Sequence, residues 1–322
     1  MSLGEFDFIV VGAGSAGCVL ANRLSEDPGS RVLLVEAGGS DWNPLIHVPI
    51  GAGLMLRSTV HGWNYHTEPV PGLKGRTEYW PRGKVVGGTS SINGMVYIRG
   101  AARDYDGWAR DGCRGWSFDE VLPYFLKAER HLDRTGPFHG NAGPLSVQTG
   151  NWDDPLFRAF VQSAVEAGHP RNEDFNGPVQ EGFGRYDFTI RAGRRCSTAV
   201  AYLKPVASRP NLVILKHVLA RRILFEGRRA HALELSIGGQ LRQVRAHREI
   251  IISAGAVGSP RLLMSSGIGD AQALGALGIG CTAHVPDVGK NLQDHVNVPI
   301  QYGCKRAATM HQLVRFDRAA RH

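Results

Sequence analysis

The sequence predicts an α/β protein built around a Rossmann-like nucleotide-binding unit. Apolar runs typical of buried parallel strands lie at residues 6–11 and 31–35. Between them, the glycine-rich turn G-A-G-S-A-G at residues 12–17 leads into a segment with helical periodicity, and the second run ends at Glu36. Strand, G-x-G-x-x-G turn, helix, strand and acid, in this order, are the signature of a βαβ unit that binds a dinucleotide.

Each residue of the turn has a predicted role. Gly12 permits the tight turn, Gly14 lets the backbone approach a pyrophosphate, and Gly17 lets the helix pack closely on the strand. The helix expected over residues 18–24 follows the turn, and its N-terminus offers free N–H groups and a partial positive charge. The turn therefore predicts a phosphate-binding site.

Glu36 stands where an acid accepts hydrogen bonds from the adenosine ribose of a dinucleotide. Its negative charge would meet the like charge of a 2′-phosphate, which disfavours NADP. The motif by itself does not distinguish NAD from FAD.

A second glycine-rich loop occupies residues 80–94 (WPRGKVVGGTSSING). Gly87 and Gly88 precede three hydroxyl residues, and Asn93 follows. Clustered N–H donors and short polar side chains suit a phosphate or the polar edge of a ring system. The alternative is a plain surface loop. The apolar and aromatic residues around the loop favour burial, and a ligand can then supply the partners that its backbone groups need.

Composition limits the classes of function. Hydrophobic residues make up 43% and charged residues 20% of 322 residues, which excludes a mostly disordered chain. The net charge of +8 favours anionic partners in general, but no basic tail or aromatic-interleaved basic stripe predicts nucleic-acid binding.

The five cysteines are widely spaced, without C-x-x-C, which argues against a disulfide framework or a structural zinc site and favours a reducing compartment. With neither a basic signal-peptide region nor an apolar run of membrane-spanning length, we expect a soluble, cytoplasmic protein without a transmembrane segment.

The second half of the sequence predicts further elements. An amphipathic helix is expected over residues 153–168, with Asp153 or Asp154 as N-cap and Gly168 as terminator. Its predicted apolar face consists of Phe157, Phe160, Val161, Ala164 and Val165. Strand-like runs follow at residues 212–216, 222–225, 231–237 and 249–253. The arginines among these runs are interpreted as a solvated sheet face rather than a site for an acidic partner.

Three further segments carry a resemblance to a known family. Residues 83–106 (GKVVGGTSSINGMVYIRGAARDYD) resemble the first signature of the glucose–methanol–choline (GMC) flavin oxidoreductases, and residues 255–269 resemble the second. Residues 288–295 (VGKNLQDH) are similar to a further run of that family. With the βαβ unit, these matches extend from Asp7 to His295 in the family's order. The resemblance implies a Rossmann-like FAD-binding domain (residues 1–152 and 211–302) interrupted by an incomplete α+β substrate domain (residues 153–210 and 303–322).

The resemblance also implies a set of FAD contacts. The pyrophosphate would lie on Gly12, Gly14, Ser15, Ala16 and Gly17, the ribose on Glu36, and the adenine against the backbone of Val218. The flavin side would be lined by Trp63, Arg82, Gly87, Gly88, Asn93, Gly94, Met95 and Val96, and closed by Asp294 and His295. Relatives with covalent flavin have a histidine immediately before the asparagine that is Asn93 here. This chain has Ile92, which has no nucleophilic nitrogen, so we expect non-covalent FAD.

The family oxidises alcohols by hydride transfer to flavin N5, with a histidine as general base and a second histidine or an asparagine beside it. In the family both residues lie beyond the position at which this sequence stops, so no catalytic residue is assigned here. His295 is interpreted as structural, and His47, His61, His66 and His139 as surface or loop-packing residues without metal-ligand spacing.

The leading hypothesis is therefore a choline- or alcohol-dehydrogenase-like flavoprotein with a small alcohol substrate and an unidentified electron acceptor. A flavin-binding fragment without turnover is the main alternative. A hydroxynitrile lyase would need the same absent histidine. An NAD-only dehydrogenase would leave the loop at residues 83–106 unexplained.

Overall fold

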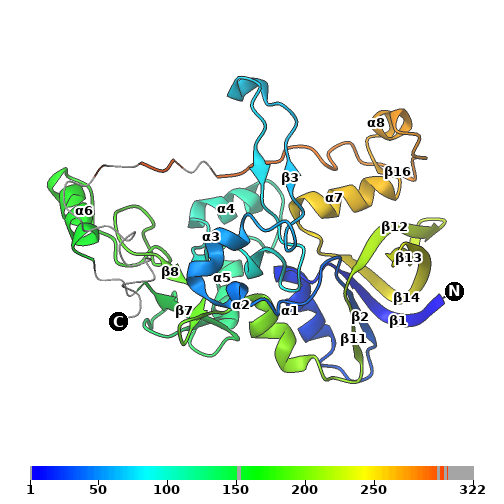
Figure 1. The fold of residues 1–322 in the computed structure, drawn as a ribbon, viewed down its shortest axis with the longest axis horizontal. Helices are drawn as coiled ribbons and strands as arrows, with labels where there is room; N and C mark the ends of the chain where they lie inside the picture. Colours follow the sequence, from blue (N-terminus) through cyan, green and yellow to red (C-terminus); the bar gives the residue numbers. More distant parts are fainter. Residues whose placement is uncertain (1, 151–153, 296–297, 301–302, 304–322) are drawn as a thin grey trace.

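The computed structural model describes residues 2–150, 154–295, 298–300 and 303, and its largest element is a six-stranded sheet (Figure 1). The strand order is β11-β2-β1-β14-β13-β12. The bounds are β1 (Ser2–Val11), β2 (Val32–Val35), β11 (Leu212–Leu215), β12 (Val218–Glu226), β13 (Arg229–Ile237) and β14 (Gln240–Ile252). Strands β11, β2, β1 and β14 are parallel, whereas β13 pairs antiparallel with both β14 and β12. The predicted α/β, Rossmann-like fold class is confirmed.

Apolar residues fill both faces of the central strands. Ile9, Val10, Leu33 and Leu34 have no exposed surface, as expected for parallel strands covered on both sides. Since side chains alternate along a strand, Val10 and Leu34 pack with α1 (Ser15–Leu24) and η4 (Ala199–Leu203) in one core. Ile9 and Leu33 pack in the other core, with β12, β13 and Leu262 of α7 (Gly255–Ser265). The two cores thus hold α1 and α7 on opposite faces of the sheet.

A smaller sheet has the strand order β5-β8-β7-β6. Its strands are β5 (Val96–Tyr97), β6 (Glu129–His131), β7 (Leu145–Thr149) and β8 (Asp187–Phe188), and α4 (Ala102–Arg110) and α5 (Phe118–Ala128) pack together beside them. This sheet takes strands from both of the domains expected from the sequence, so the boundary between residues 152 and 153 stays a prediction.

The predicted helix at residues 153–168 is α6 (Pro155–Glu166), at the end of the molecule opposite to the hairpin of β12 and β13 (Figure 1). Asp154 is the N-cap, and its side chain accepts a hydrogen bond from Leu156 N at 2.7 Å; Asp153 lies outside the described residues. Val161 and Ala164 of the predicted apolar face are buried, whereas Phe160 is 58% exposed.

Two of the predicted strand runs are too short. The run at 222–225 is part of β12, which begins at Val218, and the run at 249–253 is only the end of the 13-residue strand β14. Pairing with β13 extends both strands through polar residues that alternate with buried ones. The arginines on these strands are exposed, except for the half-buried Arg242, which agrees with a solvated face.

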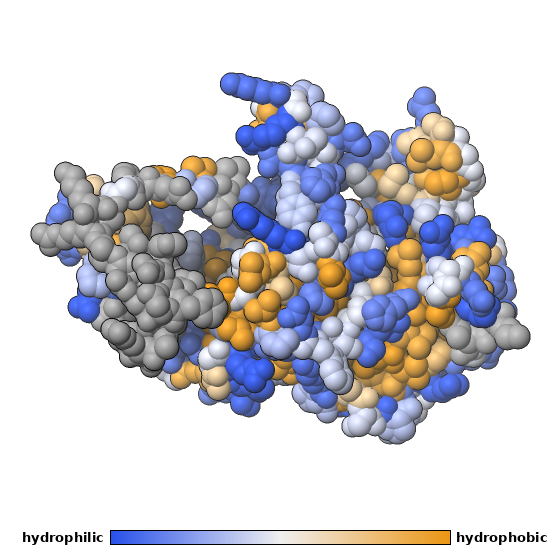
Figure 2. Space-filling model, in the orientation of Figure 1, coloured by the Kyte–Doolittle hydropathy of each residue, from blue (hydrophilic) through white to orange (hydrophobic). Residues whose placement is uncertain are grey.

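The connecting segments contain short elements. The hairpin of β3 (Tyr65–His66) and β4 (Tyr79–Trp80), with η2 (Pro71–Leu73) at its turn, projects from the body of the molecule (Figure 1). The remaining elements are α2 (Pro44–His47), η1 (Pro49–Gly51), α3 (Ala52–Met55), η3 (Gly88–Ser91), β9 (Ile190–Arg191), β10 (Arg194–Arg195), η5 (Lys204–Val206), β15 (Ile268–Gly269), α8 (Ala271–Ala276) and β16 (Ala283–His284). Apolar side chains reach the surface over the six-stranded sheet and around α8 (Figure 2). No helix within the described residues has the length and apolar character that a membrane span requires.

Candidate functional site

The two glycine-rich loops cross each other at the carboxyl edge of the six-stranded sheet. Gly12 has φ +99°, a conformation that favours glycine, which confirms its tight turn. A Cβ on Gly17 would lie 1.8 Å from Gly12 O, and a Cβ on Gly88 would lie 2.7 Å from Gly14 Cα. Gly87 N donates to Ala13 O at 2.7 Å. The close contact between the loops therefore requires glycine at position 88, and the tight first turn requires glycine at position 17.

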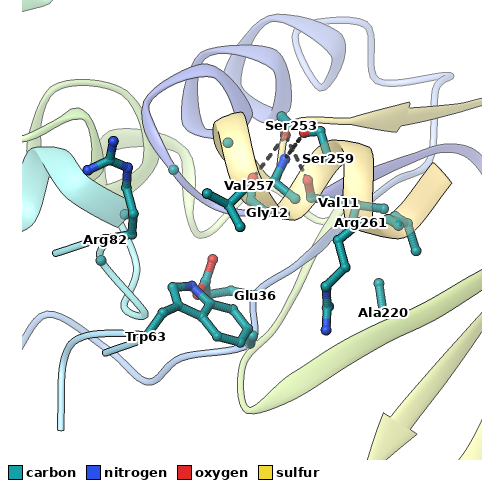
Figure 3. A pocket seen from close by; sticks show the side chains of 18 of the residues that line it. Val11, Gly12, Glu36, Trp63, Arg82, Ala220, Ser253, Val257, Ser259 and Arg261 are labelled. Carbon is teal, nitrogen blue, oxygen red and sulfur yellow. Dashed lines mark hydrogen bonds between the residues drawn. The ribbon is translucent and has the colours of Figure 1, made fainter. Parts of the chain in front are cut away.

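A cavity of about 540 Å³ opens beside this crossing. Its floor is formed by the ends of β1 and β2 and by residues 218–220 of β12, and its rim by segments around Trp63 and Arg82 (Figure 3). This is the crevice outside the carboxyl ends of parallel strands, where open α/β sheets bind ligands. The volume is in the range of pockets for small molecules and cofactors.

Two helices begin at this cavity. Helix α1 starts after β1 with Gly14 as N-cap, and α7 starts after β14 with Ala254 as N-cap; neither N-cap provides a side-chain hydrogen bond. Ser253 Oγ donates to Val11 O and Gly12 O, both at 3.0 Å, and so joins the two strand-to-helix turns (Figure 3). Two helix N-termini facing one cavity make it favourable for an anionic ligand.

Glu36 is buried, 6% exposed, at the end of β2. Its Oε2 accepts from Ala13 N at 2.9 Å and its Oε1 from Gly38 N at 2.8 Å. Burial raises the pKa of this carboxyl above its usual value, against the effect of these hydrogen bonds and of the Lys84 charge. Each carboxylate oxygen can accept a second hydrogen bond, so Glu36 holds the first glycine turn in place and still presents an acceptor to the cavity.

Aromatic and basic side chains form the opposite wall. Trp63 and Tyr65 stack with ring centroids 5.7 Å apart, and Lys84 Nζ lies 5.0 Å from the centroid of the Trp63 ring. Arg82 and Arg261 line the cavity from opposite ends, with Glu36 and Trp63 between them (Figure 3). The wall therefore offers flat surfaces for ring systems and two guanidinium groups for polar or anionic ones.

The structure brings nine of the predicted cofactor residues together around the cavity: Gly12, Gly14, Ser15, Ala16, Glu36, Trp63, Arg82, Gly88 and Val218. Gly17 and Gly87 support the loop crossing behind them. Six others are not among the lining residues: Asn93, Gly94, Met95, Val96, Asp294 and His295. Of these, Asp294 Oδ2 lies 3.9 Å from Arg82 Nη2, which links the segment around residue 294 to the rim.

Sequence reasoning missed the wall formed by residues 253–259 and the side chains of Tyr65 and Arg261. A signal was present, because the strand run that ends at Ser253 is followed by Ala254 and Gly255 and then by a helix. That is a second strand-to-helix turn, and parallel pairing of β1 with β14 places it beside the first. Residues 255–269 also carry the second family resemblance, but their place beside the first turn follows from the sheet order.

A second cluster of polar residues lies in the smaller sheet. Arg99 Nη2 donates to Glu129 Oε2 at 2.5 Å, and His139 bridges Glu129 Oε1 (Nδ1, 3.2 Å) and Asp174 Oδ2 (Nε2, 2.7 Å). Glu129 and the Arg99 and His139 side chains are almost completely buried. The expectation of a surface role is therefore wrong for His139: it lies in a loop, as expected, but is buried, and folding brings two carboxylates to its ring.

The same cluster contains a group of metal-ligating residue types, since atoms of Glu129, His131 and His139 lie within 4.8 Å of one another. Here these atoms are engaged by protein groups. Arg99 occupies one oxygen of Glu129, and His131 Nδ1 accepts from Asp133 N and Arg134 N. His131 Nε2 faces Asp187 Oδ2 at 3.3 Å. The geometry is that of an ion-pair network.

Comparison with known proteins gives consistent similarities. A family model described as GMC oxidoreductase matches residues 6–297. The mitochondrial choline dehydrogenase of Mus musculus is 50% identical over 316 residues, which cover 95% of this chain and 53% of that protein. An oxygen-dependent choline dehydrogenase of Brucella anthropi is 48% identical over 307 residues, covering 95% of this chain and 56% of that protein. The chain thus spans about half the length of the curated relatives it matches.

Solved structures show the same similarity. Pyridoxine 4-oxidase from Mesorbium loti superimposes with a TM-score of 0.84 at 40% identity, covering 88% of this chain and 56% of that chain. An FAD-dependent oxidoreductase from Chaetomium thermophilum gives a TM-score of 0.81 at 34% identity, covering 87% and 51%.

Proposed function

The chain belongs to the GMC oxidoreductase family of FAD-binding flavoproteins, and on that premise we propose that it binds FAD non-covalently and supports the oxidation of a small alcohol to an aldehyde or ketone. The observation that carries the proposal is the cavity at the crossing of the two glycine-rich loops. Relatives named as choline dehydrogenases make choline the first substrate to test.

The residues around the cavity fit such a cofactor. A Cβ on Gly14 would meet only Gly88 Cα, at 3.9 Å, so the space in front of this glycine is open to a ligand. The uncapped N-termini of α1 and α7 suit the negative pyrophosphate. Glu36 presents an acceptor for ribose hydroxyls, and the stacked rings of Trp63 and Tyr65 provide a flat apolar surface.

When bound, FAD supplies the acceptor for the hydride that leaves the alcohol carbon. The described residues bind and orient. We propose that Gly12, Gly14, Ser15 and Ala16 hold the pyrophosphate and that Val218 faces the adenine. Trp63, Arg82 and Gly88 would hold the remaining part of the cofactor within the cavity.

Support for non-covalent binding comes from Ile92. This side chain is completely buried in a cluster with Ile46, Met55 and Val85, and it is not among the residues that line the cavity. It offers no nitrogen for a bond to the flavin. Retention of flavin would then depend on non-covalent contacts with the residues that line the cavity.

The proton of the alcohol needs a base, and none of the described residues that line the cavity is a histidine. His295 is exposed, and its backbone N–H donates to Asp294 Oδ1. This observation favours a second candidate function, a flavin-binding unit without turnover of its own. The two candidates differ in one measurable property, which is reduction of bound flavin by an alcohol.

The visible spectrum of the purified 322-residue chain, incubated with FAD, tests the binding site. We expect flavin bands that pass into the supernatant after acid precipitation. Gly14→Val should abolish flavin retention while the fold is kept, because the added side chain extends into the open space of the cavity. Normal retention by this variant would contradict the assignment of the cavity, and flavin in the pellet would contradict the argument from Ile92.

Anaerobic addition of choline, and then of pyridoxine, to the FAD-loaded chain tests turnover. Bleaching of the flavin bands would support an alcohol oxidoreductase. An unchanged spectrum in a chain that retains FAD would support the flavin-binding unit.

We also propose the discontinuous domain division expected from the sequence and a cytoplasmic location. The described cysteines, Cys18, Cys113, Cys196 and Cys281, are all free thiols, which supports a reducing compartment. Cell fractionation would test the location, and recovery in an oxidising compartment would contradict it.

A further inference from the structure

Arg195 is a buried cation to which no role has been assigned so far. It lies on β10 and is 2% exposed. Burial lowers the pKa of its guanidinium to about 10, so the side chain stays protonated at neutral pH. In the part of the chain that the structure describes, Arg195 forms no ion pair with a carboxylate, whereas the buried Arg99 is paired with Glu129.

All acceptors of Arg195 are neutral. Its Nε donates to Ile46 O at 2.7 Å, and its Nη1 donates to Ser90 O at 3.1 Å and to Asn93 Oδ1 at 2.8 Å. Its Nη2 is buried and has no partner among the described residues. Burial of a charge without a counter-ion is costly, so a cation at this position calls for an explanation beyond packing.

The contacts of Arg195 fix the second glycine-rich loop. Asn93 Oδ1 accepts from Met95 N at 3.1 Å as well as from Arg195, and Met95 has φ +64°, which is uncommon for a residue with a side chain. Ser90 is held a second time, because Thr198 N donates to Ser90 Oγ at 3.1 Å. The same loop places Gly88 and Thr89 in the cavity wall.

We propose that Arg195 is a positioning residue for the cofactor site, which fixes residues 88–95 beside the cavity and provides a permanent positive charge behind them. The proposal rests on the proposed function. If FAD bound in the cavity accepted a hydride, it would gain a negative charge, and the fixed cation of Arg195 would stabilise that charge in a poorly solvated region. The charge of Arg195 therefore favours reduced over oxidised flavin, and its donors keep the loop in shape for both.

Three variants separate the charge from the hydrogen bonds. Arg195→Gln removes the charge, whereas Arg195→Lys keeps the charge but loses the planar fork of donors. Arg209→Gln is the control, since Arg209 also ties segments together through neutral acceptors, Asn22 O and Ser25 Oγ, at the far end of α1. Hydrogen exchange of the backbone amides is measured on each chain without FAD, and the midpoint potential of the flavin on each chain with FAD.

Both Arg195 variants should increase amide exchange in residues 88–96 and leave β1 and β2 protected. Arg195→Gln should also weaken the preference for reduced flavin at least tenfold, a shift of about 30 mV to more negative potential for a two-electron couple. The midpoint potential of Arg195→Lys should lie closer to that of the unmodified chain than the potential of Arg195→Gln does. Arg209→Gln should change neither the midpoint potential nor the amide exchange of residues 88–96.

Unchanged exchange in residues 88–96 in both variants would overturn the positioning role. Equal potentials for Arg195→Gln and the unmodified chain would overturn the role of the charge, and would leave Arg195 as a structural tie. If the unmodified chain binds no FAD, the proposed function and the electrostatic part both fall, whereas the exchange data still decide whether Arg195 fixes the loop. If Arg195→Gln does not fold, Arg195→Lys alone tests the loop through its amide exchange. Because Arg195→Lys keeps the positive charge, a shift of its midpoint potential by about 30 mV or more to negative values would then overturn the role of the charge.

Discussion

The cavity at the crossing of the two glycine-rich loops and the Glu129 network both contain polar groups away from the surface, yet they are built in opposite ways. The cavity is shaped by backbone: glycines where a Cβ does not fit, and two uncapped helix N-termini. The network is shaped by charged side chains, with Glu129 between Arg99 and His139 and almost no solvent access. The cavity offers an entering anion two helix N-termini and the guanidinium groups of Arg82 and Arg261, whereas the charges of the network are paired with one another. The comparison teaches that a polar region open to a ligand leaves donors free, and a structural one pairs them.

Removal of the central carboxylate of the network should have the largest effect on stability. Glu129→Gln leaves Arg99 and His139 buried without their shared anion, and breaking such a pair costs about 3–5 kcal/mol. Urea unfolding followed by circular dichroism measures the loss. Glu173→Gln is the control, because this exposed ion pair with Arg171 should contribute less than about 0.5 kcal/mol. If the two variants lose equal stability, the network is no more important than a surface pair.

A substitution in the first glycine-rich turn should lower the unfolding free energy less than Glu129→Gln does, but it should weaken FAD binding more. Gly17→Ala places a Cβ 1.8 Å from Gly12 O, and the displacement of the turn should cost about 1–3 kcal/mol. FAD affinity should fall with it, because the same turn lines the cavity. Gly275→Ala in α8 meets no atom within 4 Å and should be neutral or slightly stabilising. Unchanged FAD affinity of Gly17→Ala would show that the turn tolerates a side chain and would remove the contrast between the two regions.

The same contrast explains which parts could be predicted from the sequence. The strand, turn and helix around Gly12 are local, so spacing alone predicts them and Glu36 with them. The first turn of α7 lies in the same cavity through strand order, which no local pattern encodes. The network depends on Arg99, Glu129, His139 and Asp174, which are far apart in the sequence and surrounded by turn residues. Its members become recognisable only when folding brings opposite charges together away from water.

The smallest effect that we expect is a change of the unfolding free energy with pH, which should arise in the Glu129 network through His139. Burial disfavours the charged form of His139, but its hydrogen bonds to Glu129 and Asp174 outweigh burial, so the pKa of His139 lies above its usual 6.5. A raised histidine pKa contributes stability that is complete below about 6.5 and is lost as the pH rises through the folded-state value. The unfolding free energy should therefore decrease as the pH rises above about 6.5.

His139→Gln should flatten this decrease, whatever its effect on the absolute stability, and His66→Gln, at an exposed position, should keep it.

Asp187 does not interfere, because its pKa is lowered: burial acts to raise it, but His131 and Arg134 outweigh burial. Its contribution is present above about pH 3.8 and is lost only as the pH falls further. Within the described residues, no histidine lines the cavity. The titratable carboxyl there is Glu36, whose pKa burial raises, so FAD affinity should not follow the titration of His139. A parallel loss of FAD affinity and stability as the pH rises above about 6.5 would mean that the network and the cavity are coupled, and that the structural region also serves the binding site.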